Sequence, residues 1–475
     1  MIFRHAEHHL KEWYRSRRRK PLVLRGARQV GKSTLLRQFA ANNELVLAEI
    51  NLERHLYLDA VFKTLDLERI IYELEAVAGQ KINSADTILF LDEIQGTPHA
   101  IQALRYFYED RPHIPVVSAG SLLEFTLADH HFSMPVGRIT YYHLGPLTFK
   151  EFLFAVSPDL EKYLAGFKLG EEIPMAAHKK LLNRQREYLF VGGLPEAVQV
   201  FVDEGSLTAV TAVQRSIADT YQDDFAKYAK QKDLVLLQQI FRYIPRSLGK
   251  KVKYSNMVRE EPSLKVKNVI ELLANARICH QVFHSHCTGI PLYADINPNA
   301  YKLLFMDVGM ANHICGNDWL LLESVDERSL VNEGGLAEQF IGQHLLHPHQ
   351  APQLCYWLRE GKSSNAEVDY VISQGNLIVP IEVKAGKSGA LKSLQQFVFR
   401  KRVKLAVRFD LNPPSAQNVK NVIRTKEGNH EVEYTLVSLP LYMVEELPRI
   451  LDDLRKEEQV SSLRSSAAEH LGTME

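Results

Sequence analysis

The chain has 475 residues, which exceeds what one ordinary hydrophobic core accommodates and indicates about three domains. Hydrophobic residues make up 45% and charged residues 24%, a composition that excludes disordered and fibrous proteins. Lysine plus arginine and aspartate plus glutamate are equal at 57 each, so any contact with nucleic acid has to come from local basic patches.

The cysteines and the N-terminus predict the compartment. Four cysteines are too few for a disulfide framework, and the first residues lack the apolar stretch of a secretion signal. No apolar run approaches the length that spans a bilayer. We therefore expect a cytoplasmic protein without a membrane partner.

A phosphate-binding loop is predicted between the first strand and the next helix. Residues 21–24 have the pattern of a short buried strand, and residues 34–39 that of an amphipathic helix. The nucleotide-binding residues expected between and beside them are Gly26, Ala27, Arg28, Gln29, Val30, Gly31, Lys32, Ser33 and Thr34. Glycine, four residues, glycine, lysine and a hydroxyl is the spacing of a P-loop. We expect Lys32 to reach the β and γ phosphates of ATP and Ser33 to bind Mg²⁺.

Two carboxylates follow the apolar run 87–91. Such a run is typical of a central parallel strand, and its polar residues come at the C-terminal edge, beside the P-loop. Successive strand residues point to opposite sides, so the two acids are expected to have different roles. We expect Asp92 to support Mg²⁺ and Glu93 to orient the water that attacks the γ phosphate.

Two further residues are candidates for the ATPase site. The strand predicted at 114–121 ends in hydroxyls, of which Ser118 and Ser121 are both candidates to sense the γ phosphate or position water, and a plain turn is the alternative. Arg138 precedes another strand pattern at 140–147. It either neutralises charge on the transferring phosphoryl group, in its own chain or a neighbour's, or is an ordinary surface arginine.

These segments resemble the additional-strand class of P-loop ATPases, in which the catalytic glutamate directly follows the metal aspartate. The P-loop, residues 90–95, 137–138, 146–152 and 191–196 resemble more closely the prokaryotic AAA-family ATPases that carry a C-terminal DUF4143 domain. That resemblance covers nearly the whole chain. Ser33 and Thr34 stand where many relatives have two threonines, which preserves the hydroxyl. Ser118 stands where a threonine often precedes the glycine, which leaves the sensor assignment open.

The middle of the chain predicts a helical connector and then a winged helix. Residues 150–230 have mainly helical patterns, broken at Gly192 and Gly193, where a hinge and a simple turn are both open. Helices are predicted at 234–242, 254–260 and 263–276, the last capped by Ser263, with a strand at 278–283. Six polar residues of this region either contact DNA or keep an exposed helix soluble. They are Lys265, Lys267 and Asn268, which lie off the apolar face of the last helix, with Lys250, Lys251 and Lys253. Cys279, His280, His284, His286 and Cys287 lack paired zinc-ligand spacing and are expected to be ordinary strand and turn residues.

A second set of chemical residues lies on a predicted hairpin near the C-terminus. A two-residue turn at Gly375 and Asn376 sets the register, which places Asp369 opposite Glu382. Opposed residues share a face, so both carboxylates could hold one divalent cation. Lys384 points to the same side and could orient or deprotonate a water aimed at a phosphodiester.

This arrangement resembles that of the PD-(D/E)xK nuclease superfamily, with Asp369, Glu382 and Lys384 at the motif positions. The resemblance implies Mg²⁺ or Mn²⁺ on Asp369 and Glu382, a further acid at Glu338 or Glu333, and a supporting Gln396. Val368 stands where members carry a proline. An inactive remnant of the fold and an exposed salt-bridged hairpin are the alternatives.

The predicted fold is α/β: a P-loop ATPase domain of the additional-strand class, a helical and winged-helix middle, and a C-terminal restriction-endonuclease-like domain. The expected boundaries are 1–155, 156–232, 233–325, 326–450 and a tail at 451–475. We expect a protein that hydrolyses ATP and acts on DNA. A homo-oligomer and a regulatory protein partner are open possibilities. The alternative is a nucleotide-dependent switch whose nuclease-like domain binds DNA or protein without cutting.

Overall fold

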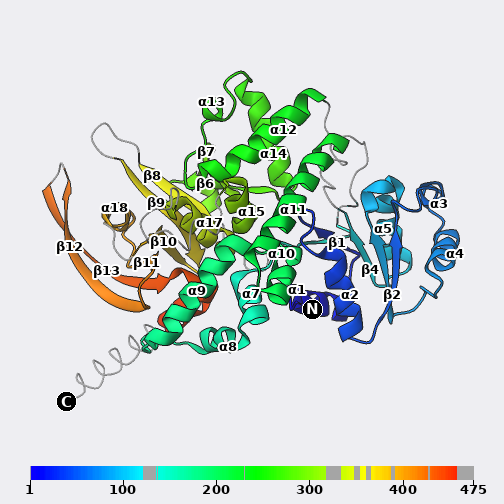
Figure 1. Cartoon of the computed structure of the whole chain (residues 1–475), viewed down its shortest axis with the longest axis horizontal. Helices are drawn as coiled ribbons and strands as arrows, with labels where there is room; N and C mark the ends of the chain where they lie inside the picture. Colours follow the sequence, from blue (N-terminus) through cyan, green and yellow to red (C-terminus); the bar gives the residue numbers. More distant parts are fainter. Residues whose placement is uncertain are drawn as a thin grey trace, which may run out of the picture.

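The computed structural model describes residues 2–120, 135, 137–228, 231–316, 333–346, 354–359, 365–386, 391–425 and 428–456. The ATPase part, a central group of helices and the C-terminal sheet follow one another along the longest axis (Figure 1). The predicted sensor alternative Ser121 and the C-terminal tail from 457 onward lie outside the described residues.

A five-stranded parallel sheet forms the ATPase part. Its order is β2-β3-β4-β1-β5, with β1 Leu22–Arg25, β2 Val46–Asn51, β3 Thr87–Asp92, β4 Val116–Ala119 and β5 Thr140–His143. All residues of β3 are buried, as a central parallel strand requires. The strand β4 lies between β1, which leads into the P-loop, and β3, which ends in Asp92. This inserted strand confirms the additional-strand arrangement.

Helices cover both faces of this sheet. They are α1 Ala6–Arg15, α2 Lys32–Asn42, α3 Leu58–Phe62, α4 Leu67–Ala78 and α5 Pro98–Asp110. One apolar core unites β1, α1 and α2 with the central helices, while a second lies between the opposite face and α3, α4 and α5. Residues 58–78 form two helices, because Leu65 adopts a left-handed backbone (φ 55°) and Asp66 caps α4 through bonds from the N–H groups of Glu68 and Arg69.

The central region is helical. It comprises α7 Phe149–Val156, α8 Pro158–Gly166, α9 Met175–Val191, α10 Pro195–Glu204, α11 Leu207–Tyr228, α12 Gln231–Tyr243, α13 Tyr254–Met257, α14 Ser263–Asn275 and α15 Val308–Ile314. The three helices expected for a winged helix are present as α12, α13 and α14. Ser263 does not cap α14, because the N-cap position falls on Pro262 and no side chain bonds there.

An eight-stranded mixed sheet forms the C-terminal part. Its order is β12-β13-β11-β10-β9-β8-β6-β7. The strands are β6 Cys279–Ser285, β7 Ile296–Phe305, β8 Cys355–Arg359, β9 Ala366–Gln374, β10 Leu377–Val383, β11 Leu405–Asp410, β12 Ser415–Thr425 and β13 Gly428–Pro440. The helices α17 Glu333–Leu345 and α18 Lys392–Lys401 pack against it. A short 3-10 segment, Leu441–Glu446, leads into a last helix.

The hairpin of β6 and β7 belongs to this sheet. Phe283 and His284 of β6 pair in parallel with Cys355 and Tyr356 of β8. The sheet therefore crosses the boundary expected at 325/326. The hairpin after α14 does not stand free as a wing, and the winged helix stays a prediction.

Candidate functional site

The P-loop has the backbone of a phosphate cradle. It connects β1 to α2 and contains three residues with positive φ: Gly26 (142°), Gln29 (61°) and Gly31 (88°). A Cβ on Gly26 would stand 2.1 Å from the carbonyl oxygen of Leu144, so no other residue fits there. The N-terminus of α2 opens into the loop, where its unpaired N–H groups and dipole favour an anion.

Lys32 and Ser33 lie where the sequence predicted them. The Lys32 ammonium donates to the carbonyl oxygens of Gly26 (3.1 Å) and Ala27 (2.9 Å), so it is held inside the loop. The Ser33 hydroxyl donates to Oδ2 of Asp92 at 2.9 Å. The two expected magnesium ligands, which are far apart in sequence, therefore adjoin each other.

Asp92 is suited to a cation. Its burial, and to a smaller degree the neighbouring charge of Glu93, raise the pKa of its carboxyl, while the Ser33 hydroxyl lowers it. A nearby divalent cation would relieve the cost of ionising this buried group. By donor chemistry Ser33 and Asp92 fit Mg²⁺, which takes hard oxygen ligands.

Glu93 is oriented by a residue that the sequence reasoning missed. Its backbone is left-handed (φ 52°), and its Oε2 accepts a hydrogen bond from Nε2 of Gln95 at 2.5 Å. Gln95 is buried and packs against Gly120, where an added Cβ would stand 2.3 Å from the Gln95 amide oxygen. Gln95 therefore fixes the carboxylate of Glu93. Its position two residues after Glu93 is the only sequence signal for this role.

Ser118 and Arg138 differ in their placement. Ser118 is fully buried on β4, and its hydroxyl has no hydrogen-bond partner among the described residues. Arg138 precedes β5, whose first residue, Thr140, pairs with Leu22 at the start of β1. The P-loop follows the other end of β1, and Arg138 pairs at 2.8 Å with Glu109. This position does not support a role for Arg138 at the P-loop of its own chain.

The P-loop is tied to the central helices. The Arg28 guanidinium forms an ion pair with Asp224 of α11, and the Tyr221 hydroxyl donates to the Arg28 carbonyl oxygen at 2.7 Å. Arg4 donates to the carbonyl oxygen of Val30 at 2.9 Å and pairs with buried Glu151. Although burial alone would raise it, the charges of Arg4 and His5 hold the pKa of Glu151 at about 2.

The two glycines after α9 form a packed junction. The N–H of Gly193 donates to Asp307 at 2.7 Å, and its carbonyl oxygen accepts from Leu147 at 2.6 Å. An added Cβ would stand 2.1 Å from the Leu147 carbonyl at Gly193 and 2.2 Å from the Asp307 carboxylate at Gly192. These contacts account for both glycines as sites of close backbone approach.

The predicted hairpin register is present at the second site. Gln374 pairs with Leu377 and Tyr370 with Ile381, so the next opposed pair is Asp369 with Glu382. Between β8 and β9 the register shifts, with Cys355 opposite Val371 and Trp357 opposite Val368, which is a β-bulge beside Asp369. Bulges re-aim side chains near functional sites. The Val383 N–H donates to Oδ2 of Asp369 at 2.8 Å, which holds the carboxylate across the hairpin.

Lys384 and Glu382 are in contact. The Lys384 ammonium lies 2.6 Å from Oε1 of Glu382, while Oε2 of Glu382 is buried without a hydrogen-bond partner among the described residues. Burial, with the neighbouring charge of Asp369, raises the pKa of Glu382 to about 7. The amide oxygen of Gln396 is likewise buried without such a partner.

A buried lysine from β7 occupies the acidic cluster. The Lys302 side chain is 3% exposed, and its ammonium lies 3.1 Å from Oε2 of Glu338 and 3.9 Å from Oδ1 of Asp369, and pairs also with Glu367. Burial raises the pKa of Glu338 to about 8 and lowers that of Lys302, whose net pKa is nevertheless raised by the three carboxylates. Sequence reasoning found Glu338 but missed Lys302 and Glu367. The lone lysine in the apolar segment 301–305 was the available signal.

The metal fit of this second site is partial. Asp369 and the unpaired oxygen of Glu382 offer hard donors, which suit Mg²⁺ or Mn²⁺. Within the described ranges no three His, Cys, Asp or Glu side chains form a group that could hold a metal ion. Lysine ammonium groups share the remaining carboxylate oxygens. Glu333, the alternative acid, begins α17, and its side chain lies outside the described residues.

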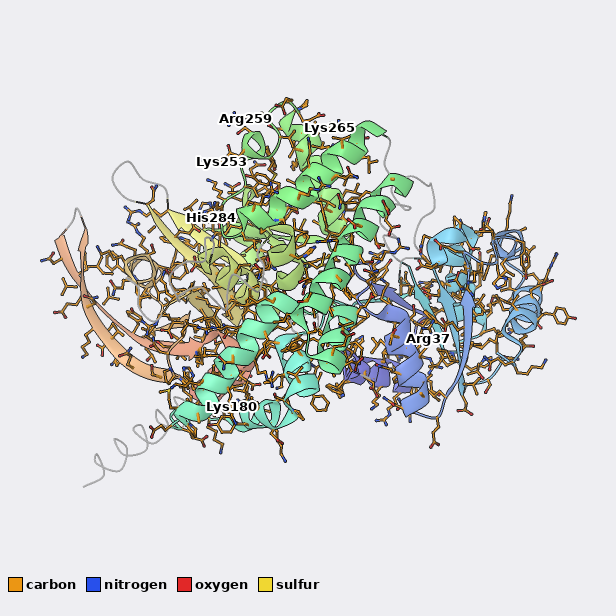
Figure 2. The ribbon with its side chains drawn as sticks, in the orientation of Figure 1. Arg37, Lys180, Lys253, Arg259, Lys265 and His284 are labelled. Atoms are coloured by element: carbon orange, nitrogen blue, oxygen red, sulfur yellow. The ribbon has the colours of Figure 1, made fainter. Side chains whose placement is uncertain are left out.

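The lysines expected on the third helix of the winged-helix region carry acidic partners. Lys265 lies 3.2 Å from Glu261 and 3.5 Å from Asp233, and Lys267 lies 3.7 Å from Glu271. Figure 2 shows Lys265 with Arg259 and Lys253 at the exposed end of the helical region. These ion pairs neutralise Lys265 and Lys267, two of the five lysines that were expected to meet DNA.

Family models match three parts of the chain. Residues 18–153 match an AAA domain, residues 333–442 match the domain of unknown function DUF4143, and residues 182–320 match the domain of unknown function DUF8612. No curated protein matches the chain. Among the described residues, no helix is long and apolar enough to cross a membrane.

Solved structures with detectable likeness have low identity. The Aeropyrum pernix ORC1 protein in complex with DNA is 14% identical, with 68% of this chain and 94% of that chain covered and a TM-score of 0.26. AMPPCP-bound DnaA from Aquifex aeolicus is 12% identical, with 58% and 90% covered and a TM-score of 0.27. C. elegans PCH-2 is 13% identical, with 43% and 65% covered and a TM-score of 0.26.

The strand order, the P-loop and the AAA match define the class of the N-terminal part: residues 18–153 form an AAA-type P-loop domain. The same chain carries a DUF4143 domain at residues 333–442, as the sequence resemblance predicted.

Proposed function

We propose that the chain hydrolyses ATP with Mg²⁺ at the P-loop. The observation that carries this proposal is the 2.9 Å bond between Ser33 and Asp92, with Glu93 next in the chain and oriented by Gln95. Ser33 and Asp92 would hold the metal, which neutralises charge on the phosphates. Lys32 binds the β and γ phosphates, and Glu93 orients the attacking water.

Phosphate release by the purified protein tests this proposal. Lys32→Ala is expected to abolish magnesium-dependent turnover, and Glu93→Gln to retain nucleotide binding while losing most turnover, about 10²-fold or more. Lys180→Ala, an exposed change on α9 (Figure 2), is the control and is expected to leave turnover unchanged. Full turnover in Lys32→Ala would contradict the proposal.

We infer that nucleotide state is transmitted through α11. Arg28 lies within the phosphate loop, and its partner Asp224 lies on a helix that also packs against α12 and α15. A phosphate that attracts Arg28 would weaken its pair with Asp224. Asp224→Asn is expected to leave ATP hydrolysis in place and to remove the influence of ATP on the C-terminal domain. The measurement is hydrogen exchange of the α11 amides, whose protection should respond to ATP in the unchanged protein and not in the variant.

The C-terminal domain is proposed to act on DNA as a metal-dependent nuclease of the PD-(D/E)xK type. The supporting observation is the assembly of Asp369, Glu382 and Lys384 on one hairpin, with an unpaired oxygen on Glu382. Asp369 and Glu382 would hold Mg²⁺ or Mn²⁺, which stabilises negative charge on a phosphodiester. Lys384 would orient or deprotonate the attacking water.

Cleavage of linear, circular and branched DNA with Mg²⁺ or Mn²⁺, with and without ATP, tests the nuclease proposal. The expected result is cutting that disappears in the Glu382→Ala, Lys384→Ala double variant. Lys180→Ala, an exposed change on α9 (Figure 2), is the control. Cutting that persists in the double variant would contradict the assignment.

A second candidate is a nucleotide-dependent switch without nuclease activity. The observation that favours it is Lys302, an internal cation already shared by Glu338, Glu367 and Asp369. Intact ATP turnover with no cutting on any substrate is the result this candidate predicts.

A further inference from the structure

A basic cavity lies at the edge of the C-terminal sheet, apart from the acidic cluster. Its volume is about 710 Å³, and it is lined by β6, β7, β8 and the C-terminal end of α18. The acidic cluster includes Glu338 of α17, which does not line the cavity. In the cavity wall, Trp357 packs edge-on against Phe397 of α18, with the ring centroids 5.3 Å apart. The cavity is therefore a separate site.

The charge of this cavity is uniformly positive. Its basic lining residues are Lys251, Arg359, Arg400, Lys401 and Arg402, and within the described part of the chain no Asp or Glu lines it. Among the described residues, Arg359, Arg400, Lys401 and Arg402 form no salt bridge; Asp295, which does not line the cavity, interacts electrostatically with Lys401. In this they differ from Lys265 and Lys267 of α14. In a chain with a formal net charge of zero, such unneutralised clustering marks a local anion-binding surface.

Arg402 supports this interpretation through its backbone. It ends α18 in a left-handed conformation, with φ 53°. Glycine is the favoured residue at such a helix end. Because Arg402 occupies this position in place of glycine, its guanidinium adds a positive charge to the cavity lining.

His284 is a fixed imidazole in the cavity wall. It is 6% exposed and lies on β6 of the C-terminal sheet (Figure 2). Its Nδ1 accepts from the Leu358 N–H at 3.3 Å, so the proton of the neutral ring is on Nε2. The ring also hydrogen-bonds to the backbone of Tyr356, so both neighbours on β8 fix its orientation in the cavity wall.

An aromatic ring completes the lining. Phe399 is half-buried in the cavity wall, and its ring lies 4.8 Å from that of His430. A basic groove combined with an aromatic side chain is the combination that binds single strands, whose bases are free to stack. A duplex presents its bases inward and offers only its backbone.

We propose that this cavity binds a single-stranded nucleic acid, with its phosphates on Arg359, Arg400, Lys401 and Arg402 and a base against Phe399. The inference deepens the proposed action on DNA, and it adds a binding site that involves neither the P-loop nor the acidic cluster. DNA and RNA share the phosphate chemistry, and the test distinguishes them.

Fluorescence anisotropy with labelled oligo-dT and oligo-U, and with a DNA duplex of equal length, tests the proposal. EDTA is present and ATP is absent, so the measurement depends on neither turnover nor cleavage. The Arg400→Gln, Lys401→Gln, Arg402→Gln variant is expected to bind single strands at least tenfold more weakly. Its salt dependence, log K against log salt, should flatten by about 2, since each single-strand phosphate contact contributes about 0.7.

The matched control removes the same number of charges elsewhere. Lys162→Gln, Lys179→Gln, Lys180→Gln, on the exposed surface of α8 and α9, is expected to change affinity less than twofold. Phe399→Ala leaves every charge in place and is expected to weaken single-strand binding about five- to tenfold, in line with the loss of one stacking contact. Thermal melting of each variant establishes that it is folded.

Four results would overturn the proposal: unchanged affinity in the arginine and lysine variant, an equal loss in the control, duplex binding as tight as single-strand binding, or no binding of any strand. Any of these with ATP hydrolysis and DNA cleavage intact would leave the proposed function standing and remove only this site. Tighter binding of oligo-U than of oligo-dT would identify RNA as the ligand.

Discussion

The ammonium of Lys302 lies 3.1 Å from the carboxylate of Glu338, although β7 and α17 lie on opposite sides of the boundary expected at 325/326. The same ammonium serves Glu367 and Asp369. A cation of the chain itself thus stands beside Asp369, which the sequence assigned to a divalent metal.

Replacing Lys302 with methionine is expected to have opposite effects with and without metal. Removing one partner of a buried ion pair costs about 3–5 kcal/mol, because the carboxylates stay buried and unpaired. In EDTA, the melting temperature of Lys302→Met should therefore fall by several degrees. Added Mn²⁺ should restore it, and calorimetry should show Mn²⁺ binding about tenfold tighter than in the unchanged protein, or 1.4 kcal/mol.

Lys253→Met is the control for that experiment, because Lys253 is exposed (Figure 2). Equal melting temperatures of Lys302→Met and the unchanged protein in EDTA would show that Lys302 does not neutralise the cluster.

Gln95→Ala is expected to separate catalysis from binding. Gln95 bonds to Glu93 and is not itself among the predicted ATP contacts, so its loss should lower kcat about tenfold and leave KM for ATP within about twofold. Steady-state phosphate release gives both constants. An increase in KM without a change in kcat would indicate that Gln95 serves binding instead.

The junction glycine is expected to tolerate no side chain. In Gly193→Ala the new Cβ would stand 2.1 Å from the Leu147 carbonyl, so the backbone must shift. We expect a loss of about 2–4 kcal/mol in the free energy of unfolding, measured by urea denaturation. Gly166→Ala, where nothing lies within 4 Å, should cost less than about 0.5 kcal/mol. Similar values for the two variants would refute the close packing of the junction.

Glu445 is expected to make stability depend on pH. Burial raises its pKa to about 7 from an ordinary 4.5, so between these values the folded chain binds a proton that the unfolded chain does not. This contribution is present at low pH and is lost as pH rises through 7. Glu445→Gln can still accept from the Lys150 N–H, a bond of 2.7 Å, and lacks the charge.

The check is a pair of melting curves at pH 6 and pH 8.5. The variant should gain about 1.4 kcal/mol on the unchanged protein over that interval, because only the unit between pH 6 and the pKa near 7 contributes. A difference that is constant between the two pH values would exclude this titration.

Sequence rules recovered the features that depend on local spacing. The P-loop and the pairing of Asp369 with Glu382 follow from a fixed loop length and a two-residue turn, and the structure has both. Asp92 follows from the burial of β3.

Features that depend on distant contacts were not recoverable in this way. Lys302 is a single lysine in a strand pattern, and only the pairing of β6 with β8 brings its hairpin to the acidic cluster. Arg138 is adjacent in sequence to a strand, but strand direction decides at which edge of the sheet it lies. The partners of Gly193 come from Leu147 and Asp307, which no local pattern connects.

The pairing of β6 with β8 also has a bearing on how this protein can be divided. A fragment that began near residue 326 would lose β6 and β7, leaving β8 as an open edge with unpaired backbone groups and the acidic cluster without its lysine. The DUF4143 segment is therefore not a complete structural unit by itself. Any transfer of it to another ATPase would have to carry residues 279–305 along with it.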